Sequence, residues 1–133
     1  MDYLKYAFIA LVGWGFWAIG SKLLSQRLNT ESLTFWISFW SLFLLAIFLC
    51  FKKTLQFNAG SLYAIPVGIV SLVAVLAFYQ ALKCGPASVV IPLTNLYILF
   101  PVLFGFLFLK EAATPSRIMG IIFAILAAIF LSR

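Results

Sequence analysis

Long apolar runs separated by short polar segments dominate the pattern of this chain. A helix crosses the hydrocarbon layer of a membrane with about 20 mostly apolar residues. The runs are apolar throughout and lack the two-residue alternation of membrane barrel strands. The pattern therefore predicts an all-α integral membrane protein with five transmembrane helices. We expect these spans at residues 4–24, 33–51, 62–82, 88–109 and 115–131.

The segments between the spans carry residues that favour turns and helix ends. Ser32 is the expected N-cap of the second span, and Cys-Gly-Pro at residues 84–86 separates the third span from the fourth. Thr114 and Pro115 are expected to open the fifth span as its N-cap and first helical residue. Because the connections are short, consecutive helices should be antiparallel neighbours. We expect residues 1–133 to form a single membrane domain.

The composition agrees with a membrane location. Hydrophobic residues make up 65% of the chain and charged residues 9%, whereas soluble domains have about 25% charged residues. The chain has no histidine and two cysteines, so histidine catalysis, histidine metal ligands and a four-cysteine zinc site are excluded. No paired acids, nucleophile–base pair or phosphate-binding loop is present. We therefore expect no enzyme, no catalytic residue, no metal and no cofactor.

The basic residues lie at the ends of the apolar runs. They form no cluster of the kind that tracks a nucleic acid backbone, so we expect the lipid bilayer as a partner and no nucleic acid. The nine basic residues divide almost evenly between the two membrane sides, which scarcely specifies an orientation. Either the N-terminus is cytoplasmic, or both orientations insert and pair as an antiparallel dimer. One side carries Lys5, Lys52, Lys53, Lys110 and Arg117, and the other carries Lys22, Arg27, Lys83 and Arg133.

All three acidic residues lie at or beyond the ends of the spans, so no intramembrane carboxylate is available as a proton relay. Lys22 lies near the end of the first span and shares a helix face with Gly15 and Ala18. Two interpretations of Lys22 remain open. Its ammonium reaches the headgroups, as lysines near helix ends do, or it joins small residues in the wall of a cavity for an anionic group.

Two prolines interrupt the fourth span. Pro92 and Pro101 each remove a backbone donor, which frees the carbonyls of Ser88 and Tyr97. Asn95 lies between the prolines and is the most polar residue in the middle of a span. Broken helices of this kind are typical of transporter binding sites, although a simple kink satisfied by side chains remains the alternative. We take Pro92, Asn95 and Pro101 as candidates for lining a substrate cavity.

Other cavity candidates lie on the first and third spans. Tyr79 and Gln80 come near the end of the third span, and an ordinary hydrogen bond between helices is the alternative for Gln80. Trp14 and Trp17 lie within the first span. They are expected either to line an aromatic pocket or to belong to an interfacial aromatic belt, although their depth favours the pocket.

Small residues recur every four positions on the fifth span. Gly120, Ala124 and Ala128 form a ladder of the small-xxx-small type, which allows two helices to approach closely. We interpret the ladder as helix packing within the chain or at a dimer interface. Cys50 and Cys84 are expected near opposite membrane faces. They would fall on the same side only between the two chains of an antiparallel dimer.

The second half of the chain, from residue 81, reads ALKCGPASVVIPLTNLYILFPVLFGFLFLKEAATPSRIMGIIFAILAAIFL. It resembles one half of an EamA-type transporter of the drug/metabolite transporter superfamily, in its single five-span, half-length form. The matching elements are Ala81-Leu82, Gly85, Ala87, Val89, Pro92, Pro101, Glu111, Thr114 and Gly120, with Trp14-Gly15 and Lys22 in the first span.

The resemblance implies one half of a ten-helix inverted-repeat bundle. It implies a multi-pass secondary transporter of small metabolites, amino-acid-like compounds or drugs in a bacterial or archaeal plasma membrane. Pairing as a homodimer, or with a second half-transporter, would complete the bundle and permit alternating access. The first-helix carboxylate of the small multidrug resistance proteins is missing, which argues against proton-coupled drug antiport. An accessory or scaffold subunit of a membrane complex, including a lipid-linked-sugar flippase subunit, is the alternative.

Overall fold

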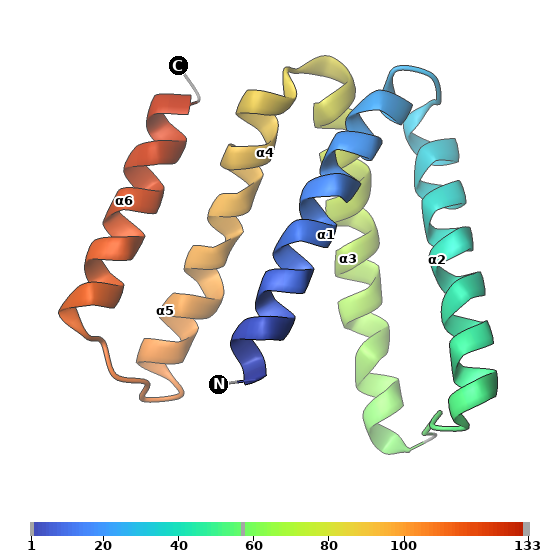
Figure 1. Cartoon of the computed structure of the whole chain (residues 1–133), viewed down its shortest axis with the longest axis horizontal. Coiled ribbons are helices and arrows are strands. Elements are labelled where there is room, and N and C mark those ends of the chain that lie inside the picture. Colours follow the sequence, from blue (N-terminus) through green and yellow to red (C-terminus); the bar gives the residue numbers. More distant parts are fainter. Residues whose placement is uncertain (1, 57, 132–133) are drawn as a thin grey trace. The chain divides into compact units, whose positions relative to one another are not determined.

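The structure is a computed structural model that describes residues 2–56 and 58–131. The described residues form helices and connecting loops, with no strand among them (Figure 1). This confirms the predicted all-α fold. The elements are α1 (Asp2–Ser25), α2 (Thr30–Lys52), α3 (Ala59–Cys84), α4 (Ala87–Asn95), the 3₁₀ turn η1 (Leu96–Ile98), α5 (Leu99–Leu107) and α6 (Pro115–Leu131).

Four apolar stretches in the described residues are long enough to cross a membrane. They are Tyr3–Ser25, Thr30–Lys52, Ala59–Cys84 and Ala87–Leu107, with lengths of 23, 23, 26 and 21 residues. The fifth, α6, is apolar and has 17 residues, which is the lower end of the range for a spanning helix. The chain is therefore a membrane protein with five apolar helical segments.

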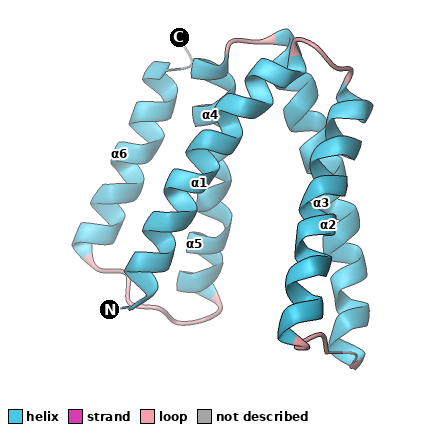
Figure 2. Ribbon diagram, turned by 45° about the vertical axis from the view of Figure 1, so that its right-hand side comes forward, coloured by secondary structure: helices cyan, strands magenta, loops and turns pink. Residues whose placement is uncertain are grey.

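The chain divides into two compact units, Met1–Cys84 and Gly85–Arg133, which are called unit 1 and unit 2 below. In unit 1, α3 packs against both α1 and α2, and Figure 2 shows α2 lying beside α3. Its buried apolar core lies where α1 turns into α2 and α3 ends. The core consists of Ala18, Leu33, Tyr79 and Leu82.

Unit 2 contains α4, η1, α5 and α6, and in it α6 packs against α4. Its buried residues are Val90, Gly105 and Ala128. Small and β-branched side chains thus make the close contacts of this unit. Most large apolar side chains of both units are exposed, as expected of helices that face lipid.

The predicted helix starts were correct for α6 and wrong for α2. At α6, the Arg117 backbone N–H donates to the Thr114 hydroxyl at 3.4 Å, and Pro115 is the first helical residue. At α2, the N-cap is Asn29, whose Oδ1 accepts from the Ser32 backbone N–H at 2.8 Å. Because the helix begins at Thr30, before the predicted start, Ser32 donates to the cap instead of forming it.

The fourth span is broken in its middle. Helix α4 continues through Pro92, and the chain then tightens into η1 just before Pro101, the third residue of α5. Pro101 has no backbone N–H for the Tyr97 carbonyl. The 3₁₀ turn supplies a substitute pattern, in which the Leu99 N–H donates to the Leu96 and Tyr97 carbonyls. The helical direction is therefore kept while the regular α-helical ladder is interrupted.

Candidate transport site

Lys22 joins α1 to the end of α3. Its Nζ donates to the Leu82 carbonyl oxygen at 2.6 Å. Leu82 lies in the last turn of α3, where carbonyls lack partners within the helix and where the helix dipole favours a cation. The sequence suggested a lysine at the headgroups or in a cavity wall, and neither interpretation included this contact with a helix end. In this structure the ammonium contributes to holding two helices together.

A face of small hydroxyl side chains surrounds this contact on α1. Ser21 is 1% exposed and Ser25 is 2% exposed. The Ser25 hydroxyl donates to the Lys22 carbonyl at 2.8 Å. The Ser21 hydroxyl lies beside the Tyr79 phenol without the geometry of a full hydrogen bond. Sequence reasoning missed both serines, although the spacing of small residues at Ala18, Ser21 and Ser25 is a signal for close helix packing.

Trp17 and Tyr79 come together where α1 meets α3. The Trp17 ring stacks on Phe78, with centroids 5.5 Å apart and an interplanar angle of 12°, and its centroid lies 6.0 Å from that of Tyr79. Tyr79 is 1% exposed, whereas Trp14 is 64% exposed. Of these three cavity candidates, only Tyr79 is therefore buried, whereas Trp14 and Trp17, the latter 38% exposed, are both open to an incoming molecule.

Gln80 joins α2 to α3. Its Oε1 accepts a hydrogen bond from the Thr30 hydroxyl at 2.7 Å, and its Nε2 donates to the Cys84 sulfur at 3.6 Å. Thr30 was missed in the sequence, because a hydroxyl in the first turn of a helix has no periodic signal that would mark it. Four of the cavity candidates thus lie at one end of unit 1 and take part in contacts between its helices, namely Trp17, Lys22, Tyr79 and Gln80.

Asn95, Pro92 and Pro101 belong to unit 2. Asn95 is the last residue of α4 and precedes η1, and its side chain is exposed. Its amide makes no hydrogen bond with the part of the chain that the structure describes. By contrast, the hydroxyl of the neighbouring Thr94 donates to the Val90 carbonyl of its own helix at 2.8 Å. Asn95 therefore presents a polar group, open to an incoming molecule, beside the break in the fourth span.

The loop between α5 and α6 folds back onto α5. The Glu111 N–H donates to the Gly105 carbonyl at 3.0 Å. An added Cβ at Gly105 would lie 3.2 Å from the Glu111 carboxylate, so a larger residue there would crowd that side chain. Arg117 Nη1 lies 3.9 Å from Glu111 Oε2 and donates to the Ala112 carbonyl at 3.0 Å. Glu111 is thus bound within its own loop at the end of a span.

The three small residues of the predicted ladder on α6 differ in how deeply they are buried. Ala128 is 5% exposed, Ala124 is half-buried and Gly120 is exposed. An added Cβ at Gly120 would meet no atom within 4 Å. One end of the ladder therefore packs inside unit 2, and the other end has room for a further contact.

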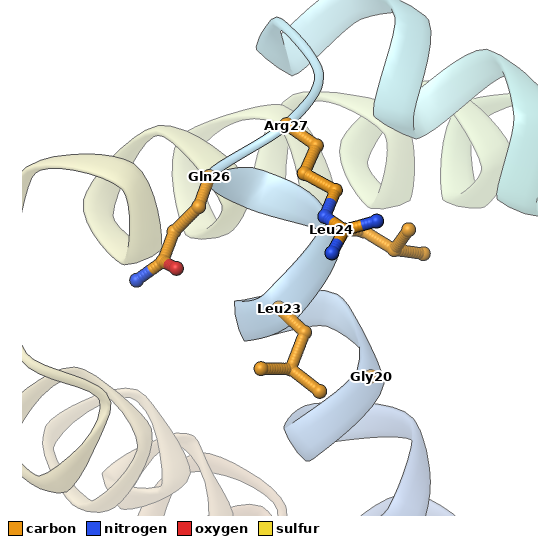
Figure 3. A pocket seen from close by; sticks show the side chains of 5 residues that line it. All are labelled: Gly20, Leu23, Leu24, Gln26 and Arg27. Atoms are coloured by element: carbon orange, nitrogen blue, oxygen red, sulfur yellow. The ribbon is translucent and has the colours of Figure 1, made fainter.

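Two hollows lie on unit 1. An open groove of about 410 Å³ is lined by residues of α2 and by Leu72 of α3. A second hollow of about 380 Å³ lies at the C-terminal end of α1 (Figure 3). The described residues contain no group of histidine, cysteine or acidic side chains that could hold a metal ion.

Comparison with known proteins agrees with this architecture. Five apolar helical segments, one of them broken, define a helical membrane protein. The chain belongs to the EamA-like transporter family, which matches residues 3–133. Membership places it in the drug/metabolite transporter superfamily, whose members are membrane transporters, generally without enzymatic activity.

One similar protein is an uncharacterised protein of Methanocaldococcus jannaschii, which is 37% identical over 70 residues. The match covers 53% of this chain and 51% of that protein, so it spans about half of each. No solved structure matches the chain.

Proposed function

We propose that this chain is one half of a secondary transporter for small metabolites, amino-acid-like compounds or drugs, and that it acts as an antiparallel homodimer. The observation that carries the proposal is the family match over residues 3–133 of a chain with five apolar helices. Two inverted sets of such helices form the bundle of many secondary transporters. A second copy in the opposite orientation would supply the missing set.

The candidate residues of each unit favour an uncharged or zwitterionic substrate with an apolar part. All three acidic residues lie at or beyond the ends of the spans, and Lys22 contacts a helix end. The accessible aromatic and amide candidates are the Trp14 and Trp17 rings and the Gln80 side chain in unit 1 and, separately, the Asn95 amide in unit 2. An amide can both donate and accept hydrogen bonds, and an aromatic face binds apolar or cationic groups.

The break at η1 supports alternating access. A 3₁₀ turn within a long helix is a common place for a hinge. In discontinuous transporter helices, backbone groups freed at the break face the binding site. Bending at residues 96–98 would move α5 relative to α4, and so relative to the Asn95 amide at the end of α4, without unfolding either helix.

Flux through purified protein in vesicles tests the transport proposal. We expect uptake of at least one class in a panel of labelled neutral and zwitterionic metabolites. Asn95→Ala should reduce it by about tenfold, because a lost polar contact costs about 1–1.5 kcal/mol. Thr94→Ala is the matched control, since its hydroxyl bonds only to carbonyls of its own helix. If no class is carried, or if both variants behave alike, the proposed transport role of this site is wrong.

Cross-linking tests the proposed antiparallel dimer. Cys50 lies near the end of α2 and Cys84 ends α3, so the two exposed thiols are at opposite ends of unit 1. An antiparallel pair should give Cys50–Cys84 bonds between chains, and Cys50→Ser should abolish them. Bonds between two Cys50 residues, or between two Cys84 residues, would indicate a parallel pair.

One observation favours the alternative function, which is that of an accessory or scaffold subunit of a membrane complex, including a lipid-linked-sugar flippase subunit. An exposed aromatic column runs along α2, in which Phe39 stacks between Phe35 and Phe43. Such a column could pack against a partner helix. Absence of flux together with co-purification of one stable partner protein would support this function.

A further inference from the structure

An apolar hollow lies beside two polar side chains at the C-terminal end of α1. Its volume is about 380 Å³. Figure 3 shows Gln26 and Arg27 on the turn after the helix, with Leu23, Leu24 and Gly20 along the preceding turns. At Gly20 an added Cβ would meet no atom within 4 Å, so the missing side chain leaves open space. Leu23 and Leu24 are exposed and form the apolar walls.

The polar part of this hollow lies at headgroup depth. Gln26 and Arg27 follow directly after the span Tyr3–Ser25. The Arg27 side chain is exposed and makes no hydrogen bond or ion pair with the described residues. A guanidinium presents a planar fork of donors that matches two phosphate oxygens. The neighbouring Gln26 amide can donate to a further oxygen. The lining contains no acidic side chain that would repel an anion.

The order of these groups along the helix matches the order of groups in a phospholipid. A helix rises 1.5 Å per residue, so Leu23 lies about 6 Å and Gly20 about 10 Å deeper than Arg27. A phospholipid in the same leaflet also presents its phosphate at the surface and its acyl chain beneath. We propose that this hollow binds an anionic phospholipid, with the phosphate on Arg27 and Gln26 and an acyl chain against Gly20, Leu23 and Leu24. The site does not depend on the transport proposal.

Lipid retention measured by native mass spectrometry tests the polar half of the site. The full-length protein is purified with equal amounts of phosphatidylglycerol and phosphatidylcholine, and the lipids that remain bound are counted. We expect selective retention of phosphatidylglycerol. Arg27→Gln should reduce it about fivefold, which corresponds to about 1 kcal/mol for one basic residue at an anionic surface. Lys83→Gln is the matched control, because it removes the same charge from the same end of unit 1 and Lys83 lines no part of the hollow.

Filling the hollow tests the apolar half. Gly20→Leu should reduce retention of both lipids, whereas Gly13→Leu should not, because Gly13 also has open space around it but lies outside the hollow. Arg27→Lys keeps the charge without the fork and should give an intermediate loss. Each variant is accepted only if its melting temperature equals that of the wild type.

Three results would overturn the inference. Equal losses in Arg27→Gln and Lys83→Gln would show diffuse attraction to the surface and no defined site. Displacement of phosphatidylglycerol by inorganic phosphate in solution would show a site for soluble anions. Equal losses in Gly20→Leu and Gly13→Leu would show that the hollow holds no acyl chain.

Discussion

Unit 1 and unit 2 hold their helices together by different means. In unit 1, Lys22 bonds α1 to α3 and Thr30 bonds α2 to α3, with stacked aromatic rings beside the first contact. The side-chain hydrogen bonds described in unit 2 stay within one helix or join the first turn of α6 to the adjoining α5–α6 loop. Polar contacts thus fix the helices of unit 1 at one end, while unit 2 packs through Val90, Gly105 and Ala128.

The difference matters for a protein that is expected to change shape. Hydrogen bonds between helices have defined directions, and inside a membrane no water is present to replace them. Packing through small residues allows close approach but has no donor–acceptor direction. With its break at η1, unit 2 is therefore the part expected to bend, and unit 1 the part expected to move as a body.

Removing the Lys22 ammonium should weaken unit 1 most. Lys22→Met keeps much of the aliphatic stem but leaves the Leu82 carbonyl without its partner, and hydrogen bonds to charged groups contribute about 1.5–3 kcal/mol. The free energy of unfolding, measured by denaturant titration in detergent, should fall by that amount. Lys83→Met, at an exposed neighbouring position of α3, should change it little. Normal stability with lost transport would instead make Lys22 part of an anion site.

Enlarging Ala128 should have the largest effect in unit 2. Ala128 is buried on α6, and inserting a larger side chain into a packed site costs about 1–3 kcal/mol. Ala128→Leu should therefore lower the unfolding free energy, whereas Gly120→Leu, on the same ladder but with open space around it, should not. If Gly120→Leu nevertheless reduces cross-linking between chains, the open end of the ladder belongs to the dimer interface.

A double-mutant cycle measures the second polar contact of unit 1. Thr30→Val and Gln80→Leu each remove one partner of the 2.7 Å hydrogen bond between α2 and α3. The coupling between them should be about 0.6–1.7 kcal/mol, the range found for such bonds in membranes. Unfolding of the two single variants and the double variant gives this value. Additive losses would mean that the contact does not stabilise unit 1, and that Gln80 is available to a substrate.

The sequence predicted the five helices because an apolar run long enough to span a membrane has few alternatives. It did not predict the partners of the polar residues. Lys22 and Gln80 stood out by their polarity, but their partners are a backbone carbonyl at the end of α3 and the Thr30 hydroxyl. Every helix ends in backbone carbonyls, and a single hydroxyl in a first turn has no periodic signal, so neither partner could be recognised in the sequence. The roles of Asn95 and the other cavity candidates stay predictions, because no ligand is present to identify a lining.

Prolines in the two units show why position along a helix matters as much as residue type. Pro66 lies inside α3, and that helix continues without interruption over Ala59–Cys84. Helix α4 likewise continues through Pro92. Only ahead of Pro101 does the chain leave the α-helical pattern, in η1. Proline content alone therefore does not locate a hinge, and the break at residues 96–98 requires its own test.

Of these substitutions, Pro101→Ala should change the unfolding free energy least and hydrogen exchange around the break most. Alanine restores an N–H for the Tyr97 carbonyl and removes the ring that crowds the preceding turn, so α4 and α5 should join as one continuous helix. We expect hydrogen exchange at residues 96–101 to slow and flux to fall, with the unfolding free energy unchanged or slightly raised. Pro115→Ala is the matched control, because Pro115 is the first residue of α6, where a helix leaves its N–H unpaired in any case. Slower hydrogen exchange with undiminished flux would show that transport does not require the break. Unchanged hydrogen exchange would show that Pro101 does not cause the break.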